Sequence, residues 1–350
     1  MESWQIIRWG EPLEKRVYPD PSPTGREVLV RVTACGVCHS DLHIWQGYFD
    51  LGGGEKIRIE DRGLTLPFTM GHEVVGEVLA VGPEAGDVRV GERRIVHPWI
   101  GCGTCPECRR GEELLCLRPR IVGTWKDGGY SDRVLVPDSK YLVAFAGVPE
   151  DVACTFACSG VTAYSALKKT GVARDDQSTL LIGAGGVGLQ ALGMAKAVIP
   201  GRVAMADTDA TKRDAAAKFG ADLVVDNRAP DAVRGVKEWS GGGVDAAIDF
   251  VGRPETARFA LDSLRKGGTL VVVGLYGDRL PLPLPWLPLR ILTLRGSYVG
   301  TLDDLKVVVR LAQEGKLPLL RVEPRPIEQV NAALTDLAAG RVTGRVVLKP

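Results

Sequence analysis

The stretch Ile182-Gly183-Ala184-Gly185-Gly186-Val187-Gly188 decides the fold of this chain. It matches the pattern G-x-G-x-x-G, in which the glycines allow a tight turn, a close backbone approach to a pyrophosphate and close helix–strand packing. A short apolar run at 179–182 comes before it, and a helical pattern at 187–198 follows it. That strand-to-helix context favours a dinucleotide site over an ordinary surface glycine turn.

Around this loop, short apolar strands alternate with helical patterns. The predicted strands are 179–182, 203–207, 223–226, 244–250, 269–274 and 292–298. The predicted helices include 187–198, 212–219 and 255–264. Such alternation forms parallel βαβ units, so we expect an α/β fold with a doubly wound sheet. The proline-rich connection 280–289 argues against a helix there. One more helix at about 303–314 and a closing strand at 344–348 complete the prediction.

The end of the second strand predicts how a dinucleotide is held. Asp207 follows Gly188 by 19 residues, where a carboxylate accepts hydrogen bonds from the adenosine ribose and repels the extra phosphate of NADP. We therefore expect NAD, and Asp207 fits the strand end better than Asp209. Lys212 is a candidate for the same ribose, although an exposed helix lysine explains it equally well. The other predicted cofactor contacts in this half are Gly183, Gly185, Gly186, Val187, Gly188 and Val273.

The first 150 residues have a different pattern. Runs such as 27–34 and 73–81 alternate apolar and polar residues with the period of a strand, and glycine and proline separate them. This indicates an antiparallel, barrel-like domain before the α/β domain.

Bulk composition excludes several functional classes. The chain has 350 residues, 45% hydrophobic and 25% charged, with a formal net charge of +1, which is typical of a globular protein of about two domains. A net charge so close to zero does not indicate binding to nucleic acid or to an anionic membrane. No apolar run reaches the roughly 20 residues that span a bilayer, and the first ten residues lack a signal-peptide core. We expect a cytoplasmic protein.

Eight cysteines in such a chain point to metal rather than to disulfides. Cys102, Cys105, Cys108 and Cys116 follow C-x2-C-x2-C-x7-C, which suits a closed, structural, tetrahedral zinc site. An iron–sulfur cluster is the alternative four-cysteine reading, and two disulfides are a weaker one.

A second, dispersed set of metal-ligand residues surrounds Cys38, His72 and Cys158. Two cysteines and one histidine would leave zinc an open fourth position, as catalysis requires. Spacing alone does not select these three, because Cys35 and Cys154 are rivals and a buried free cysteine is common.

Taken together, the motifs GVCHSDLH (36–43), GHEVVGEV (71–78), the four-cysteine segment, CSGVTAY (158–164) and GAGGVG (183–188) resemble, in kind and order, the zinc-containing medium-chain alcohol dehydrogenases. The resemblance runs from the N-terminal strands to the last residues. It implies a GroES-like β-rich catalytic domain at 1–159 and 299–350, with a zinc lobe at about 98–120. A Rossmann NAD-binding domain would occupy 160–298.

The same resemblance implies two Zn²⁺ ions per chain. Catalytic zinc is placed on Cys38, His72 and Cys158, and structural zinc on Cys102, Cys105, Cys108 and Cys116. It reads Glu73 as a transient or outer ligand and Asp41 as the residue that orients His72, where the plain alternative is a structural ion pair.

A proton relay also comes with the resemblance. Ser40, the cofactor ribose and His43 would lead from the substrate to solvent, and histidine suits that role because its pKa lies near neutrality. His39 and Arg345 resemble positions that face the cofactor pyrophosphate. His97 receives no role, and Trp45 and Trp99 are either pocket walls or core aromatics.

One segment departs from the compact members of the family. Residues 46–66 are about ten residues longer and resemble a bacterial subgroup that includes 6-hydroxyhexanoate and hydroxycyclohexene-carboxyl-CoA dehydrogenases. The segment is either a pocket rim or a surface loop, and its charges balance. Family sheets usually pair edge to edge, so we expect a dimer or tetramer.

The expected reaction is reversible hydride transfer between a primary or secondary alcohol and NAD. An ω-hydroxy-acid or hydroxyacyl-CoA dehydrogenase and a zinc-independent reductase of the superfamily are the alternative enzymes. A non-enzymatic zinc-binding protein is the alternative of another class.

Overall fold

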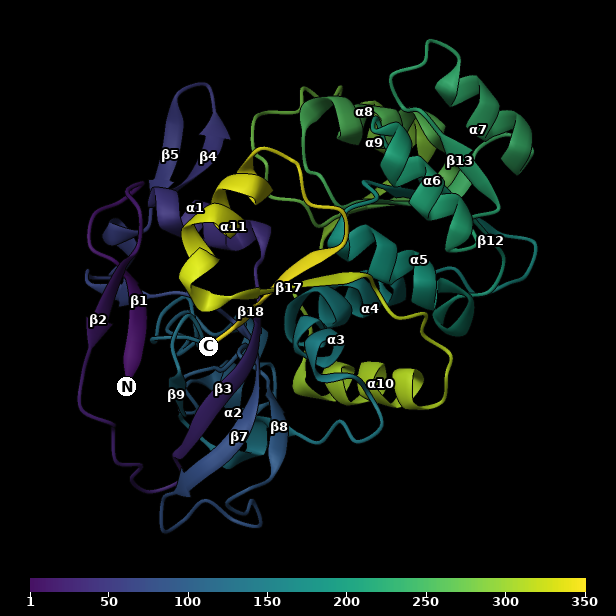
Figure 1. The fold of residues 1–350 in the computed structure, drawn as a ribbon. Coiled ribbons are helices and arrows are strands. Elements are labelled where there is room, and N and C mark those ends of the chain that lie inside the picture. Colours follow the sequence, from purple (N-terminus) through teal and green to yellow (C-terminus); the bar gives the residue numbers. More distant parts are fainter.

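The computed structural model describes residues 1–350 and has two main sheets (Figure 1). One sheet has six strands in the order β13-β12-β11-β14-β15-β16, and every neighbouring pair is parallel. Its strands are β11 (Ser178–Ile182), β12 (Arg202–Ala206), β13 (Leu223–Val225), β14 (Val244–Asp249), β15 (Leu264–Val272) and β16 (Thr293–Gly296). The order reverses direction beside β11, so the predicted doubly wound sheet is confirmed.

Helices connect the strands of this sheet. They are α5 (Gly186–Val198), α6 (Ala210–Lys218), α7 (Ala232–Ser240), α8 (Pro254–Ser263) and the short α9 (Trp286–Arg290). The prediction that residues 280–289 contain no helix was wrong. Pro285 is the N-cap of α9, and Pro288 lies in its first turn, where backbone N–H groups have no partner within the helix. Proline is therefore tolerated at both places.

The second main sheet is antiparallel apart from its last pair. Its strands are β3 (Val28–Gly36), β7 (Glu73–Val81), β8 (Arg93–Val96), β9 (Arg133–Val136), β10 (Leu142–Val143), β17 (Val322–Pro326) and β18 (Arg345–Lys349). The last strand, β18, lies between β3 and β17. The chain thus returns after the six-stranded sheet to complete the sheet in which it began. Strand β17 was not predicted.

Smaller elements complete the half that contains the antiparallel sheet. A three-stranded sheet contains β1 (Glu2–Ile6), β2 (Glu14–Val17) and β6 (Phe68–Thr69), and β4 (Tyr48–Gly52) pairs with β5 (Glu55–Arg58) as a hairpin. The helices are α1 (His39–Gln46), α2 (Pro106–Arg109), α3 (Glu150–Thr155), α10 (Leu302–Gln313) and α11 (Val330–Ala338), and α4 (Val161–Lys168) leads from this half into the six-stranded half. Single turns occur at η1 (Glu60–Arg62), η2 (Glu113–Leu115), η3 (Ser139–Tyr141), η4 (Phe156–Gly160) and η5 (Ile327–Gln329).

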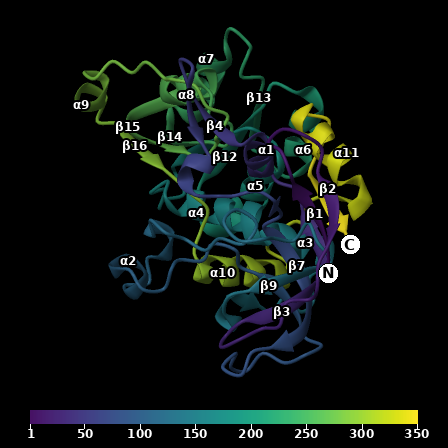
Figure 2. The ribbon, with the colours of Figure 1, turned by 90° about the vertical axis from the view of Figure 1, so that its left-hand side faces the viewer.

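The largest hydrophobic core joins the two halves. It holds 42 buried residues and runs from Cys38, Trp99 and Cys158 to Leu189 and Met194 on α5. Because α4 packs against both α5 and α10, the region around Cys158 is fixed to the six-stranded sheet. Figure 2 shows α2 projecting from the body of the molecule, away from this core. No helix is long and apolar enough to cross a membrane.

Candidate metal centres and cofactor cleft

Three distant elements bring Cys38, His72 and Cys158 together. Cys38 is the N-cap of α1, His72 lies just before β7, and Cys158 lies in the π-helical turn η4, a local distortion often found at functional sites. Their ligand atoms and a carboxylate oxygen of Glu73 all lie within 4.8 Å of one another, and all four residues are buried. The sulfurs of Cys38 and Cys158 are 3.8 Å apart. Tetrahedral zinc with bonds of about 2.3 Å would separate two sulfurs by about 3.8 Å, so these residues fit the metal.

Asp41 positions His72 within this cluster. Its Oδ1 lies 3.1 Å from His72 Nδ1, while its Oδ2 accepts hydrogen bonds from the Cys38 backbone N–H and the Tyr130 hydroxyl, both at 2.8 Å. Since Nδ1 faces the carboxylate, Nε2 is left to face the sulfurs. Asp41 thus lies where its carboxylate can orient the His72 ring.

The charges around this cluster favour a cation. Burial lowers the pKa of His72, but the nearby Asp41 carboxylate and Cys38 sulfur outweigh it and raise the pKa well above its usual value. The Cys158 thiol donates a hydrogen bond to Cys38, which lowers the pKa of Cys38 and raises that of Cys158. An imidazole and two sulfurs compete here for protons. A divalent metal can bind to these three ligands in place of the protons.

Glu73 forms a buried ion pair with Arg345 of β18. Arg345 Nε donates to Glu73 Oε2 at 3.1 Å, and Nη2 donates to Oε1. Burial raises the pKa of Glu73, and Arg345 opposes that rise. Arg345 also reaches the glycine-rich loop, because its Nη1 lies 3.1 Å from where a Cβ on Gly186 would be. It thus connects the metal cluster to the start of α5.

The two predicted relay residues lie on α1, one turn apart. Ser40 Oγ is 3.4 Å from His72 Nε2, beside the cluster. His43 packs its ring 5.0 Å from that of Phe49 on β4, and burial lowers its pKa, so the imidazole is neutral and able to accept a proton. The structure therefore places Ser40 beside the metal-ligand cluster. It places His43 one turn farther along the same helix, next to Phe49.

The glycine-rich loop has the close packing that its sequence predicted. A Cβ on Gly188 would lie 1.8 Å from the carbonyl oxygen of Gly183, whereas a Cβ on Gly185, the N-cap of α5, would meet nothing within 4 Å. The first backbone N–H groups of α5 therefore face open space, an arrangement that can bind a phosphate. Gly186 and Val187 form the first turn, and Val273 follows β15, donating its N–H to Asp249.

Asp207 lies beside this loop. Its two oxygens accept hydrogen bonds from the N–H groups of Ala184 at 2.7 Å and Asp209 at 2.9 Å. Asp209 instead caps α6 by accepting the Lys212 N–H at 3.0 Å. The structure therefore gives the two aspartates different tasks, and only Asp207 contacts the glycine-rich loop.

The four-cysteine segment forms a separate cluster. The ligand atoms of Cys102, Cys105, Cys108 and Cys116 lie within 4.8 Å of one another. Cys102 Sγ accepts hydrogen bonds from the side chain and backbone of Thr104 and the backbone of Cys105, which lower its pKa to about 5. Glu113 ties the segment to the body, accepting from Gly101 N–H at 2.9 Å and Tyr141 OH at 2.5 Å.

Other predicted residues divide between the cluster and the core. Trp99 packs 5.4 Å from the ring of His72 and 5.7 Å from Tyr298, so it lines the metal site, whereas Trp45 donates to the Glu11 carbonyl on the outside. Cys35 and Cys154 are buried and lie outside both clusters. Tyr298 and Tyr276 were missed; no motif marks them, because only the fold brings their loops to the cleft. Tyr276 OH lies 3.0 Å from His39 Nε2.

Comparison with known proteins agrees with this geometry. Residues 24–147 match the model of the alcohol dehydrogenase GroES-like domain, and residues 186–314 match that of the zinc-binding dehydrogenases. The chain belongs to the zinc-binding medium-chain alcohol dehydrogenases. It is 37% identical, over 100% of both chains, to a NAD-dependent alcohol dehydrogenase of Sulfurisphaera tokodaii. It is 35% identical to an alcohol dehydrogenase of Geobacillus stearothermophilus, over 100% of this chain and 99% of the other.

Solved structures give the same family. The alcohol dehydrogenase of Aeropyrum pernix superposes with a TM-score of 0.91 at 31% identity and full coverage of both chains. The predicted combination of a GroES-like part with a Rossmann-type parallel sheet is therefore confirmed.

Proposed function

We propose that this protein is a NAD-linked alcohol dehydrogenase with two zinc ions per chain. The observation that carries the proposal is the buried Cys38–His72–Cys158 cluster, joined to the glycine-rich loop by Arg345. Full-length similarity to NAD-dependent alcohol dehydrogenases supports the same reaction class. The zinc-independent alternative is disfavoured because both sets of ligand atoms converge.

Each residue of the site has a task in this reaction. Zinc held by Cys38, His72 and Cys158 would supply a Lewis acid that lowers the pKa of the alcohol, and NAD would supply the hydride acceptor. Ser40 would hold the departing proton at Oγ, and the neutral imidazole of His43 would accept it by way of the cofactor ribose. Asp41 fixes the orientation of His72, and Glu73 with Arg345 balances the charge behind the cluster. The buried Trp99 ring forms one wall of the site, and the Tyr298 ring packs against it.

Cofactor choice is the direct test. Asp207 is fixed beside the glycine-rich loop, where its charge would repel the 2′-phosphate of NADP. We expect tighter binding of NADH than of NADPH, measured by cofactor fluorescence without substrate, and higher kcat/KM with NAD across a panel of alcohols. Asp207→Ser should narrow both ratios. Tighter NADPH binding by the unaltered protein would contradict the assignment of Asp207 to the ribose.

The same proposal includes the division of the chain and its assembly. Residues 1–159 and 299–350 would form the catalytic domain, and 160–298 the cofactor domain. Strand β16 is an exposed edge with Leu294, and α9 and its flanks expose Leu289 and Ile291. An unpaired edge beside apolar side chains favours pairing with a second copy, so we propose a dimer or tetramer. Light scattering at micromolar concentration tests this. Eight free thiols favour a reducing compartment such as the cytoplasm.

One observation favours ω-hydroxy acids as a second substrate class. In the 46–66 segment, Arg58 pairs with Glu60, and Glu55 pairs with Arg279 of the other half. Arg62 instead lies over the ring of Trp125, and its charge acts on Tyr298 beside Trp99. A guanidinium near the pocket suits a substrate carboxylate. Arg62→Gln should then raise KM for an ω-hydroxy acid and leave the corresponding simple alcohol unchanged.

A further inference from the structure

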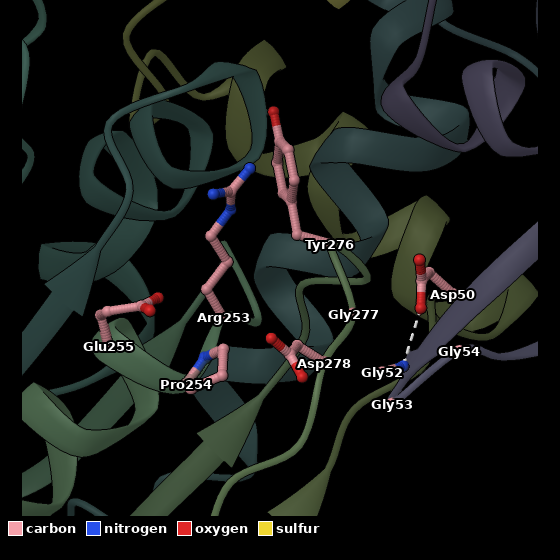
Figure 3. Close-up of a pocket in the computed structure, with 10 residues that line it drawn as sticks. All are labelled: Asp50, Gly52, Gly53, Gly54, Arg253, Pro254, Glu255, Tyr276, Gly277 and Asp278. Carbon is pink, nitrogen blue, oxygen red and sulfur yellow. Dashed lines mark hydrogen bonds between the residues drawn. The ribbon is translucent and has the colours of Figure 1, made fainter.

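Two segments from different halves of the molecule meet at the outer end of the cofactor cleft. One is the β4–β5 hairpin, and the other is the loop 276–279 that follows β15 (Figure 3). Arg279 Nη2 on the loop lies 2.8 Å from Glu55 Oε1 on the hairpin. The hairpin is therefore attached to the opposite half and does not merely decorate the surface.

Glycines form the closest points of this contact. A Cβ on Gly52 would lie 2.4 Å from Asp278 Oδ1, and a Cβ on Gly277 would lie 2.3 Å from the Asp50 carbonyl oxygen. Asp278 itself has a φ of +86°, which a non-glycine residue adopts at a cost in free energy. Such a conformation persists where neighbouring contacts hold it, so the loop conformation and the hairpin contact support each other.

The loop also has an inner contact with the catalytic machinery. Tyr276 OH lies 3.0 Å from Nε2 of His39, the first residue of α1. The Arg253 guanidinium lies 4.6 Å from the centre of the Tyr276 ring. Tyr276 and Arg253 line a cavity of about 360 Å³. Figure 3 shows Tyr276 and Arg253 on one side of it and the hairpin residues Asp50 and Gly52 on the other.

The position of these contacts matters for a bound dinucleotide. Ligands of doubly wound sheets bind at the carboxyl ends of the strands, and the loop leaves the carboxyl end of β15. The hairpin and the loop together therefore bridge the mouth of the cleft between the two halves. If the halves separate when a dinucleotide leaves the cleft, these contacts must break.

We propose that the β4–β5 hairpin is a clasp over the dinucleotide cleft, and that its contacts with loop 276–279 set how long the cofactor stays bound. The proposal rests on the proposed NAD-binding function. It gives the 46–66 segment a task in cofactor release, separate from any limit on substrate size.

Two neighbouring glycines allow a matched test by NADH release, followed by fluorescence in stopped-flow displacement. Gly52 and Gly54 have similar φ values of +75° and +83°, but a Cβ on Gly54 meets nothing within 4 Å. Both alanine variants carry the same backbone strain, and only Gly52→Ala pushes against the loop. We expect Gly52→Ala to raise the NADH dissociation rate about tenfold relative to Gly54→Ala. Equal rates in the two variants would overturn the clasp.

A charge exchange provides a second test that does not alter the backbone. Glu55→Arg and Arg279→Glu should each raise the NADH dissociation rate about twofold to fivefold, as expected for an exposed ion pair. The double variant should restore it. Glu60→Arg, which breaks the Arg58–Glu60 pair within the same segment, is the control and should leave the rate unchanged.

The outcomes separate the two proposals. If the unaltered protein fails to bind NADH at all, the NAD-linked function is wrong and the clasp falls with it. If NADH binds, but the exchange restores nothing and both glycine variants release it alike, the cofactor assignment stands and the clasp alone is wrong.

Discussion

The two cysteine-rich clusters use similar ligands in opposite settings. The lobe cluster takes four sulfurs from one short segment, and only Cys116 of these residues is buried. The catalytic cluster takes two sulfurs that are 120 positions apart in sequence, adds His72, and is fully buried. Outside the ligands, the lobe sulfurs accept backbone N–H bonds, whereas the catalytic ligands contact Asp41, Ser40 and Trp99.

This difference indicates different tasks for the metals that the two clusters are proposed to hold. Four sulfurs close a tetrahedral shell, which stabilises a loop and leaves no position for substrate. A metal held by two sulfurs and an imidazole would keep one position for substrate, since Glu73 is paired with Arg345. The open cluster also lies at the cofactor cleft, whereas the lobe projects from the molecule (Figure 2). Substitutions in each cluster should therefore fail in different ways.

The largest expected effect is on turnover. Cys38→Ser removes a ligand of the open cluster, and the lost Lewis-acid stabilisation of several kcal/mol corresponds to a fall in kcat of about a thousandfold or more. Metal analysis should find about one zinc per chain, with an unchanged circular dichroism spectrum. A variant that keeps two zinc ions and half its activity would remove Cys38 from the site.

The corresponding change in the lobe should act on stability. Cys105→Ser opens a closed shell whose binding energy contributes to folding, so we expect a loss of about 3 kcal/mol and a fall in Tm of about 4 °C. Because the lobe sulfurs lie outside the cleft, kcat measured well below the new Tm should change little. If Cys105→Ser and Cys38→Ser lose metal, stability and activity alike, the two clusters are not distinct.

The contrast also explains what the sequence could predict. The lobe was readable because its four ligands are local, and the glycine-rich loop because strand, turn and helix are contiguous. Spacing in the sequence could not select Cys38, His72 and Cys158. Cys35 lies close to Cys38 and Cys154 lies close to Cys158, so either could have been the ligand. Only the resemblance placed the three ligands, and the fold then brought the ligand atoms together.

Contacts between the two halves of the molecule could not be predicted from the sequence for a related reason. Nothing in the sequence around Glu55 points to Arg279, which is more than 200 residues away. The balanced charges of the 46–66 segment suggested neutrality, whereas its partners come partly from the other half. Helices α7 and α11 were missed because each has only nine residues, fewer than the 11–18-residue window in which helical periodicity is read. The ends of the strands in the six-stranded sheet differ from the predicted ends by only one or two residues. The exception is the start of β15, which lies five residues earlier than predicted.

A smaller effect should separate the residues behind each cluster. Asp41→Asn keeps the shape of the side chain but removes the charge that faces His72 Nδ1, which should lower kcat or zinc affinity about 10- to 100-fold. Glu113→Gln is the matched change behind the lobe, where the carboxylate accepts from Gly101 and Tyr141. It should reduce Tm slightly and leave kcat unchanged. Loss of activity in Glu113→Gln with none in Asp41→Asn would reverse the comparison.

The smallest predicted effect concerns acid sensitivity near the lobe. His97 follows β8, is buried and stacks on Tyr141, whose hydroxyl donates to Glu113. Burial lowers the pKa of His97 to about 4, although Glu113 opposes the shift. Between pH 6.5 and pH 4 the unfolded chain therefore binds a proton that the folded protein does not. Stability contributed by neutral His97 is present above pH 6.5 and falls as the pH decreases through this window.

The change in unfolding free energy between pH 7.5 and pH 5.5 measures this contribution. Removing the titrating group in His97→Phe should reduce the acid-induced loss by about 1 kcal/mol relative to the unaltered protein. Protonation of the lobe sulfurs also destabilises the protein in acid, but it is common to both proteins and cancels in the difference. Equal pH dependence in the two would assign the acid sensitivity of this region to the thiolates alone, and would show that His97 already takes up its proton in the folded state.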